Sequence, residues 1–264
     1  MTTGKLDRLP TSWLLGVIGT GAILAVVQLA LHYGEVRPDY FPPPTLVAAR
    51  LADLLLQPAF QQDMLATLQG WAAGLAIAML IGIPLGFAFG SSRTLYQMTS
   101  AIVDFMRSVP GVALIPLVIL VLGQGLEMKA TLVAYATVWP ILFNTQYGVH
   151  DVEPIGLQTA RAFALPRHAV LRHVVIPSAA PYVFTGIRVS ASIGLIVVVG
   201  AELLAGASNG LGAFILTASS SSGKMDDVIS GAFVAGTFGV VVNLGLERVE
   251  RKMFAWRQRT ILDS

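Results

Sequence analysis

The 264-residue sequence predicts an all-helical integral membrane protein with six transmembrane helices. Two features of the composition support this fold class: 55% of the residues are hydrophobic and only 12% are charged. Globular domains carry about 25% charged residues, so the composition argues against a soluble enzyme. Because the chain has no cysteine, disulfides, thiolate metal sites and cysteine nucleophiles are excluded.

Long apolar windows locate the spans, since a helix needs about 20 apolar residues to cross a bilayer. The windows 13–31, 64–92, 108–126, 130–149 and 228–246 carry no charge, and a sixth, 182–204, is interrupted only near its ends by Arg188 and Glu202. No small-residue cleavage site follows the first window, so we interpret it as a retained helix and not a signal peptide. The predicted spans lie near residues 13–32, 65–90, 103–122, 130–149, 182–204 and 228–246.

The distribution of Lys and Arg predicts the orientation of the spans. With the N-terminus inside, thirteen of the seventeen basic residues fall in cytoplasmic segments. Positive charge accumulates on the cytoplasmic side of membrane proteins. We therefore expect both the N-terminus (residues 1–12) and the tail (residues 248–264) to be cytoplasmic.

The extracytoplasmic segment 33–63 contains Phe-Pro-Pro-Pro at 41–44, followed by apolar residues at helical spacing. This pattern predicts an amphipathic helix on the outer surface, with Thr45 as its N-cap. The alternative is a bare tether between the first two spans. The apolar positions are Leu46, Val47, Leu51, Leu54 and Leu55.

The cytoplasmic segment 150–181 is too polar to span the membrane and too long for a turn. Several of its small and apolar residues fall on one helical face, and Pro166 ends that run. Such an element either presents itself to a partner or lies on anionic lipid through Arg167 and Arg172. We expect Pro177 and Pro181 to end the segment and to start the fifth span.

The spans show no catalytic chemistry, because their centres lack ionisable side chains. The sequence contains no His-Glu-x-x-His motif and no P-loop, so we predict no catalytic residue, no metal site and no cofactor bound by this chain. Span two is rich in glycine, which fits either helices that move against each other or static close packing.

Residues 158–177 resemble the cytoplasmic signature of bacterial ABC importer permeases, which reads Glu-Ala-Ala, three residues, Gly, nine residues, Ile-x-Leu-Pro. The corresponding residues are Gln158-Thr159-Ala160, then Ala164, then Val174-Val175-Ile176-Pro177. The spacing matches, but Gln158 replaces Glu and Ala164 replaces Gly. Other stretches, such as Arg107-Ser108-Val109-Pro110, resemble the nitrate, sulfonate, taurine and bicarbonate branch of this family.

The resemblance implies a type I ABC importer permease fold with a core at 61–247, in a multi-pass protein of the bacterial inner membrane. It implies an ATPase subunit that binds ATP, an extracytoplasmic solute-binding protein and a second permease chain, which we expect to be identical. No nucleic-acid partner is implied. The expected function is import of a small organic anion, such as a sulfonate, taurine, a nitrate-like ion or an aromatic acid, by alternating access.

The resemblance also implies functional residues. For coupling to the ATPase these are Gln158, Thr159, Ala160, Arg161, Ala164, Leu165, Pro166 and Pro177. For the substrate path the polar span residues are Thr67, Gln69, Tyr135, Thr137, Asn144, Ser190 and Ser192, each of which also fits an interhelical hydrogen bond. For contact with the binding protein they are Glu202, Gly210 and Gly212.

Two other functions stay open at this stage. One is a membrane scaffold that binds a cytoplasmic partner through residues 150–181 without transport. The other is a membrane-embedded enzyme, which would require an ionisable cluster converging inside the spans.

Overall fold

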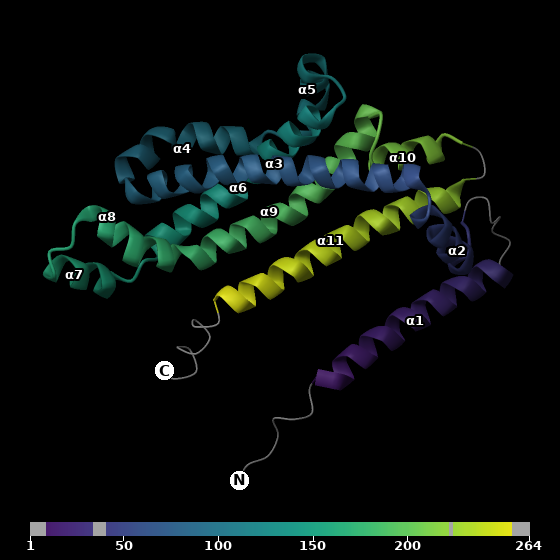
Figure 1. Ribbon diagram of the computed structural model, residues 1–264, viewed down its shortest axis with the longest axis horizontal. Helices are drawn as coiled ribbons and strands as arrows, with labels where there is room; N and C mark the ends of the chain where they lie inside the picture. Colours follow the sequence, from purple (N-terminus) through teal and green to yellow (C-terminus); the bar gives the residue numbers. More distant parts are fainter. Residues whose placement is uncertain (1–8, 34–40, 222–223, 255–264) are drawn as a thin grey trace, which may run out of the picture.

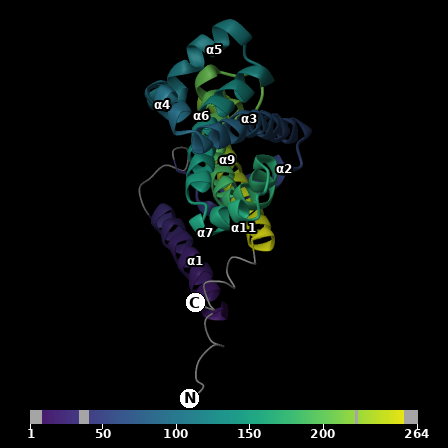
Figure 2. The same ribbon diagram turned by 90° about the vertical axis from the view of Figure 1, so that its left-hand side faces the viewer.

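The computed structural model describes residues 9–33, 41–221 and 224–254. The first eight residues and those from 255 onwards lie outside this description, so the cytoplasmic position of both termini stays a prediction. Within the described ranges every regular element is a helix. The long helices lie side by side in one elongated bundle, and α1 stands apart from it in both views (Figure 1, Figure 2).

In chain order, the helices are α1 (Leu9–Tyr33), α2 (Pro44–Leu55), α3 (Pro58–Ser91), α4 (Arg93–Ser108), the 3-10 helix η1 (Gly111–Leu114), α5 (Ile115–Leu122), α6 (Leu126–His150), α7 (Pro154–Ala162), α8 (Arg167–Val170), the π-helix η2 (Leu171–Val175), α9 (Ile176–Ala205), α10 (Leu211–Ser219) and α11 (Met225–Met253).

The bundle has two distinct ends, which we call the α2 end and the α7 end after the short helices found there (Figure 1). Helices α3, α6 and α11 run from the α2 end to the α7 end, and α9 runs back. The positive-charge distribution predicts that the α7 end is cytoplasmic.

Among the described residues, five helices are long and apolar enough to span a membrane, and there are six spans if a bent pair of helices is counted as one. That pair is α4 with η1 and α5, which meet at 79°. Its break lies at Pro110, which has no N–H to continue a helix and restricts the preceding residue to an extended conformation; Val109 accordingly has ψ 120°. Six spans were predicted correctly, but the third is not a straight helix.

The amphipathic helix predicted in the outer segment is α2, although its N-cap was wrong. Pro43 is the N-cap and Pro44 begins the helix, so Thr45 lies inside the first turn. Proline suits the first helical position, that of Pro44, because a backbone N–H there would have no partner within the helix. The helix is not a tether: its Leu54 is buried in a cluster with Phe60, Leu211 and Val234.

An ion pair also attaches α2 to the start of α11. Arg50 Nε lies 2.5 Å from Asp227 Oδ1, and Arg50 Nη2 lies 3.2 Å from Asp227 Oδ2. The hydrogen bond to Asp227 raises the pKa of Arg50 above its ordinary value. The bidentate geometry is that of a strong arginine–carboxylate pair, so it holds α2 firmly against α11.

Small residues at every fourth position of α3 form the tightest packing in the bundle, against α6. A Cβ atom added at Gly74 would lie 2.5 Å from Val133 Cβ, and one added at Gly86 would lie 2.5 Å from Thr145 Cβ. Side chains larger than hydrogen would push the helices apart, so α3 and α6 are closely packed at this interface. The buried small residues are Gly70, Gly74, Ala78, Gly82, Gly86 and Gly90.

Helix α9 begins earlier than predicted. Its first residue is Ile176 and Pro177 lies in its first turn, while Pro181 is a buried residue inside the helix. Together α8, η2 and α9 form a candidate span of 39 residues, Arg167–Ala205. Pro181 therefore does not mark the start of the fifth span.

Candidate functional site

The segment resembling the coupling motif folds as a short helix at the α7 end, outside the bundle (Figure 1). Helix α7 packs against η2, where Gly156 lies close to Val174. Its one buried residue is Ala160, which is 3% exposed. The other predicted coupling residues are exposed: Gln158, Thr159, Arg161, Ala164, Leu165, Pro166 and Pro177.

The end of α7 has a geometry that favours glycine at the position of Ala164, where the motif of the sequence analysis has Gly. The N–H of Leu165 donates to the carbonyl of Ala160 at 3.0 Å, and the N–H of Ala164 donates to that of Arg161 at 2.9 Å. These two hydrogen bonds form a Schellman motif. In this motif the residue after the C-cap takes a left-handed backbone conformation. Ala164 does so with φ 50°, at a steric cost that glycine would avoid.

Three of the exposed residues of this segment are apolar, beside the exposed polar residues Gln158, Thr159 and Arg161. Phe163 is 76% exposed, and Ile155 and Leu165 are also exposed. These three residues, which we call the α7 patch, project from an element that the bundle does not cover. Exposed apolar side chains outside the packed spans are available for contact with a partner.

Three of the seven polar residues predicted to line a substrate path, Thr67, Tyr135 and Ser190, have side chains that bond to a neighbouring helix. Ser190 donates to the carbonyl of Thr137 at 2.8 Å and so links α9 to α6. Tyr135 donates to the carbonyl of Met106 at 2.5 Å, which ties α6 to α4. Thr137 and Asn144 bond to carbonyls within α6, while Gln69 is exposed.

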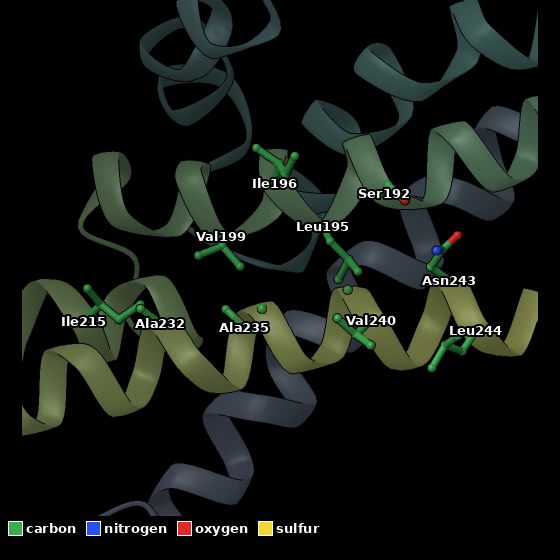
Figure 3. Close-up of a pocket in the computed structure, with 12 residues that line it drawn as sticks. Ser192, Leu195, Ile196, Val199, Ile215, Ala232, Ala235, Val240, Asn243 and Leu244 are labelled. Atoms are coloured by element: carbon green, nitrogen blue, oxygen red, sulfur yellow. The ribbon is translucent and has the colours of Figure 1, made fainter. Parts of the chain in front are cut away.

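Of the predicted path residues, Ser192 lines a groove of about 630 Å³ between α9 and α11 (Figure 3). The groove is largely apolar. Its polar side chains are Ser192 and Asn243, which lie near one end of the close-up, with Ile215 of α10 towards the other. The lining residues are Ser192, Leu195, Ile196, Val199, Ile215, Ala232, Ala235, Gly236, Gly239, Val240, Asn243 and Leu244.

Next to this groove, Arg188 of α9 is neutralised by α11. Its Nη1 lies 3.1 Å from Glu250 Oε2, its Nη2 lies 3.9 Å from a Glu247 oxygen, and its Nε donates to Asn243 at 2.9 Å. Two carboxylates balance this cation, so Arg188 acts here as a link between α9 and α11.

A buried ion pair organises the α2 end. Lys129 Nζ of α6 lies 2.7 Å from Glu202 Oε1 of α9, and the two side chains are 1% and 0% exposed. Thr67 Oγ1 of α3 lies 2.9 Å from Glu202 Oε2. A buried charge is costly unless it is paired and hydrogen-bonded, and here each charge has its partners. The ion pair and its hydrogen bond to Thr67 join α3, α6 and α9 at one point.

The same ion pair holds the loop between α9 and α10. Lys129 Nζ donates to the backbone oxygen of Asn209 at 2.8 Å, and the N–H of Gly212 donates to Glu202 at 3.0 Å. The N–H of Gly210 donates to Asp63 at 2.7 Å. We call Asp63, Thr67, Lys129, Glu202 and Asn209 the Lys129–Glu202 cluster.

The geometry of this loop requires both of its predicted contact glycines. Gly210 has φ 119°, and a Cβ there would lie 2.2 Å from the carboxylate carbon of Glu202. A Cβ at Gly212 would lie 2.2 Å from the carbonyl of Val199. Glu202, Gly210 and Gly212 are all buried, so the first is not a solvent-facing carboxylate, and the three shape the loop from within.

Sequence reasoning missed the cluster because it assigned Lys129 to an outer loop. The available signal was that Lys129 and Glu202 carry opposite charges at the same predicted end of two spans. Asp63 and Asn209 join them only through the tertiary arrangement. Among the described residues, no group of three His, Asp or Glu side chains gathers as a metal-ligand set.

These features define a class: a multi-pass helical membrane protein with a short helix presented outside the span bundle. The family described as binding-protein-dependent transport system inner membrane component matches residues 74–254, and the chain belongs to that family. The resemblance stated from residues 158–177 is thereby confirmed, as is a multi-pass location in the inner membrane. The family implies ATPase and binding-protein partners.

Similar proteins agree with this assignment. The taurine transport system permease protein TauC of Escherichia coli is 30% identical over 245 residues, covering 90% of this chain and 88% of that protein. The bicarbonate transport system permease protein CmpB of Synechococcus elongatus is 28% identical, covering 98% and 91%. The crystal structure of an amino acid ABC transporter with histidines shares the fold, with a TM-score of 0.62 at 15% identity, covering 76% of this chain and 97% of that one.

Proposed function

We propose that this chain is the permease subunit of an ATP-driven importer of a small organic anion. In this proposal, two identical chains form the path, a separate ATPase subunit binds ATP, and a solute-binding protein delivers the anion. The chain itself binds no cofactor. ATP-driven movement of the ATPase subunits, transmitted through α7, would switch the spans between inward-open and outward-open states.

The observation that carries the proposal is the α7 patch. It combines the motif spacing with three exposed apolar side chains, Ile155, Phe163 and Leu165. A hydrophobic side chain that fills a partner's pocket contributes roughly 1.5–3 kcal/mol to association. Because Ala160 is buried, a charge there would disrupt α7 itself, so the test uses an exposed residue.

The anion class is supported by relatives with named substrates. The TauC relative is named for taurine and the CmpB relative for bicarbonate; taurine carries a sulfonate, so both solutes contain an oxyanion. The groove of Figure 3 does not supply an anion site, because its lining is largely apolar.

The test is co-purification with the cognate ATPase, followed by ATP hydrolysis in proteoliposomes with the binding protein. We expect Phe163→Asp to weaken ATPase association by roughly tenfold or more, because docking would bury an unpaired carboxylate. Leu56→Asp is the matched control, since Leu56 is a similarly exposed apolar residue at the α2 end. This control should retain the ATPase.

Equal ATPase retention by the two variants would contradict docking through the α7 patch. If the wild-type chain retains the ATPase but the binding protein stimulates neither hydrolysis nor uptake of taurine or bicarbonate, the scaffold function replaces the importer.

A further inference from the structure

A second cavity lies between α4 and the last turns of α6, and nothing above gives it a function. It encloses about 550 Å³. Its lining from α6 spans Phe143 to His150, which is about 10 Å of helix next to the α7 end. Polar and apolar side chains contribute in similar measure, unlike the largely apolar groove of Figure 3.

Arg107 of α4 supplies the positive charge in this cavity. Its Nε lies 3.1 Å from Asp104 Oδ1, and its guanidinium carbon lies 5.0 Å from the centre of the Phe143 ring. The ring and the carboxylate hold the guanidinium in place. Among the described residues, neither Nη1 nor Nη2 has a hydrogen-bond partner, so the edge that can grip two oxygens is available.

Gln146 adds a second hydrogen-bonding side chain to this cavity. It lines the same cavity and is only 8% exposed, yet its side-chain amide makes no hydrogen bond within the described part of the chain. The amide of Gln146 is not among the buried side-chain atoms of the described residues that lack a partner, so it opens onto the cavity and is available to a ligand there. A ligand with acceptor atoms would satisfy the amide N–H groups.

The remaining polar lining consists of Tyr96, Tyr147 and His150. These side chains can donate hydrogen bonds, and Asp104 is the one carboxylate among the lining residues. Because Asp104 offsets the charge of Arg107, the cavity attracts an anion only weakly. Weak binding suits a site from which a transported solute must leave.

We propose that this cavity is an exit site that binds a small oxyanion, of the sulfonate or carboxylate class, before its release at the α7 end. Arg107 grips two oxygens, Gln146 donates from the wall, and Asp104 competes with the ligand for Arg107. That the anion leaves at the α7 end rests on the proposed function, in which the chain imports its solute. Binding itself needs neither ATPase nor binding protein, so it can be tested separately.

The test is saturation-transfer NMR on the full chain in nanodiscs, with taurine and methanesulfonate as probes and choline as the cationic comparison. We expect saturable binding of both anions and none of choline. Arg107→Gln should weaken binding by roughly tenfold, because a charge-assisted hydrogen bond is lost. Arg93→Gln, an exposed arginine on the same helix outside the cavity, should bind like the wild type.

Asp104→Asn distinguishes binding from a structural role, because removing the competing carboxylate should tighten binding severalfold. A damaged fold would weaken it. The inference is overturned if the wild type shows no saturable anion signal, if the two arginine variants behave alike, or if Asp104→Asn weakens binding. Loss of the taurine signal in phosphatidylglycerol nanodiscs would assign the cavity to lipid phosphate instead.

The outcomes separate this inference from the proposed function. Anion binding without binding-protein-stimulated import would keep the site and refute the importer. Import without anion binding in this cavity would keep the importer and refute the site.

Discussion

The two ends of the bundle differ in how their side chains are paired and exposed. At the α2 end, Lys129 and Glu202 are buried and paired, and the following loop donates its backbone N–H groups into the cluster. At the α7 end, apolar side chains are exposed and Ala164 sits in an unfavourable backbone conformation. The polar cluster at the α2 end has its interactions satisfied within the chain, although Leu56 is exposed at that end, whereas the α7 end presents Ile155, Phe163 and Leu165 on a short helix outside the bundle.

This difference indicates which end is rigid and which is built to engage a partner. A buried, fully bonded polar cluster specifies a single arrangement of the helices it joins. An exposed helix that packs lightly against η2 can shift when something binds it. The following predictions test this contrast, from the largest expected effect to the smallest.

The strongest test of the α2 end is Lys129→Met. Removing one partner leaves Glu202 as a buried, uncompensated charge, which should lower the free energy of unfolding by about 3–5 kcal/mol. The measurement is thermal unfolding of the purified chain in detergent.

The double variant Lys129→Met with Glu202→Gln is the control, because it removes both charges and should recover a large part of the loss. A double variant no more stable than Lys129→Met alone would show that the ion pair is not what stabilises this end.

A smaller effect is expected for Gly210→Ala. Its φ of 119° and the 2.2 Å approach to the Glu202 carboxylate leave no room for a Cβ. Strain in such a backbone region costs about 1–3 kcal/mol, so the melting temperature should fall. Gly200→Ala is the matched control, since a Cβ at Gly200 meets no atom within 4 Å. Similar melting temperatures for the two variants would contradict a loop packed tightly on Glu202.

The smallest effect is expected at the α7 end, and its sign is opposite. Ala164→Gly should stabilise the end of α7 by about 0.5–1 kcal/mol, because glycine adopts φ 50° without a steric penalty. Hydrogen exchange of the Ala164 and Leu165 amides should slow, with no change at the α2 end. Faster exchange would mean that the Schellman motif is not held as the structure shows.

Much of the fold could be predicted from composition and spacing. Charge-free windows located the spans, because the bilayer imposes a minimum apolar length, and the motif at 158–177 identified the family. Pro110 was visible in the sequence, but not the 79° bend that follows from it. The path residues were less predictable, since Thr137 and Ser190 carry hydroxyls that bond equally well to a solute or to a neighbouring helix.

By itself, the sequence determined that the chain is a multi-span membrane protein of a known transport family, because apolar length and motif spacing are properties of local chain segments. Only the tertiary structure decided that Lys129 pairs with Glu202 and that Ala160 is hidden while Phe163 is presented. It also decided that Arg107 and Gln146 face one cavity. Each of these depends on how separate helices approach one another, and that approach is determined by side-chain packing across distant segments rather than by any local pattern.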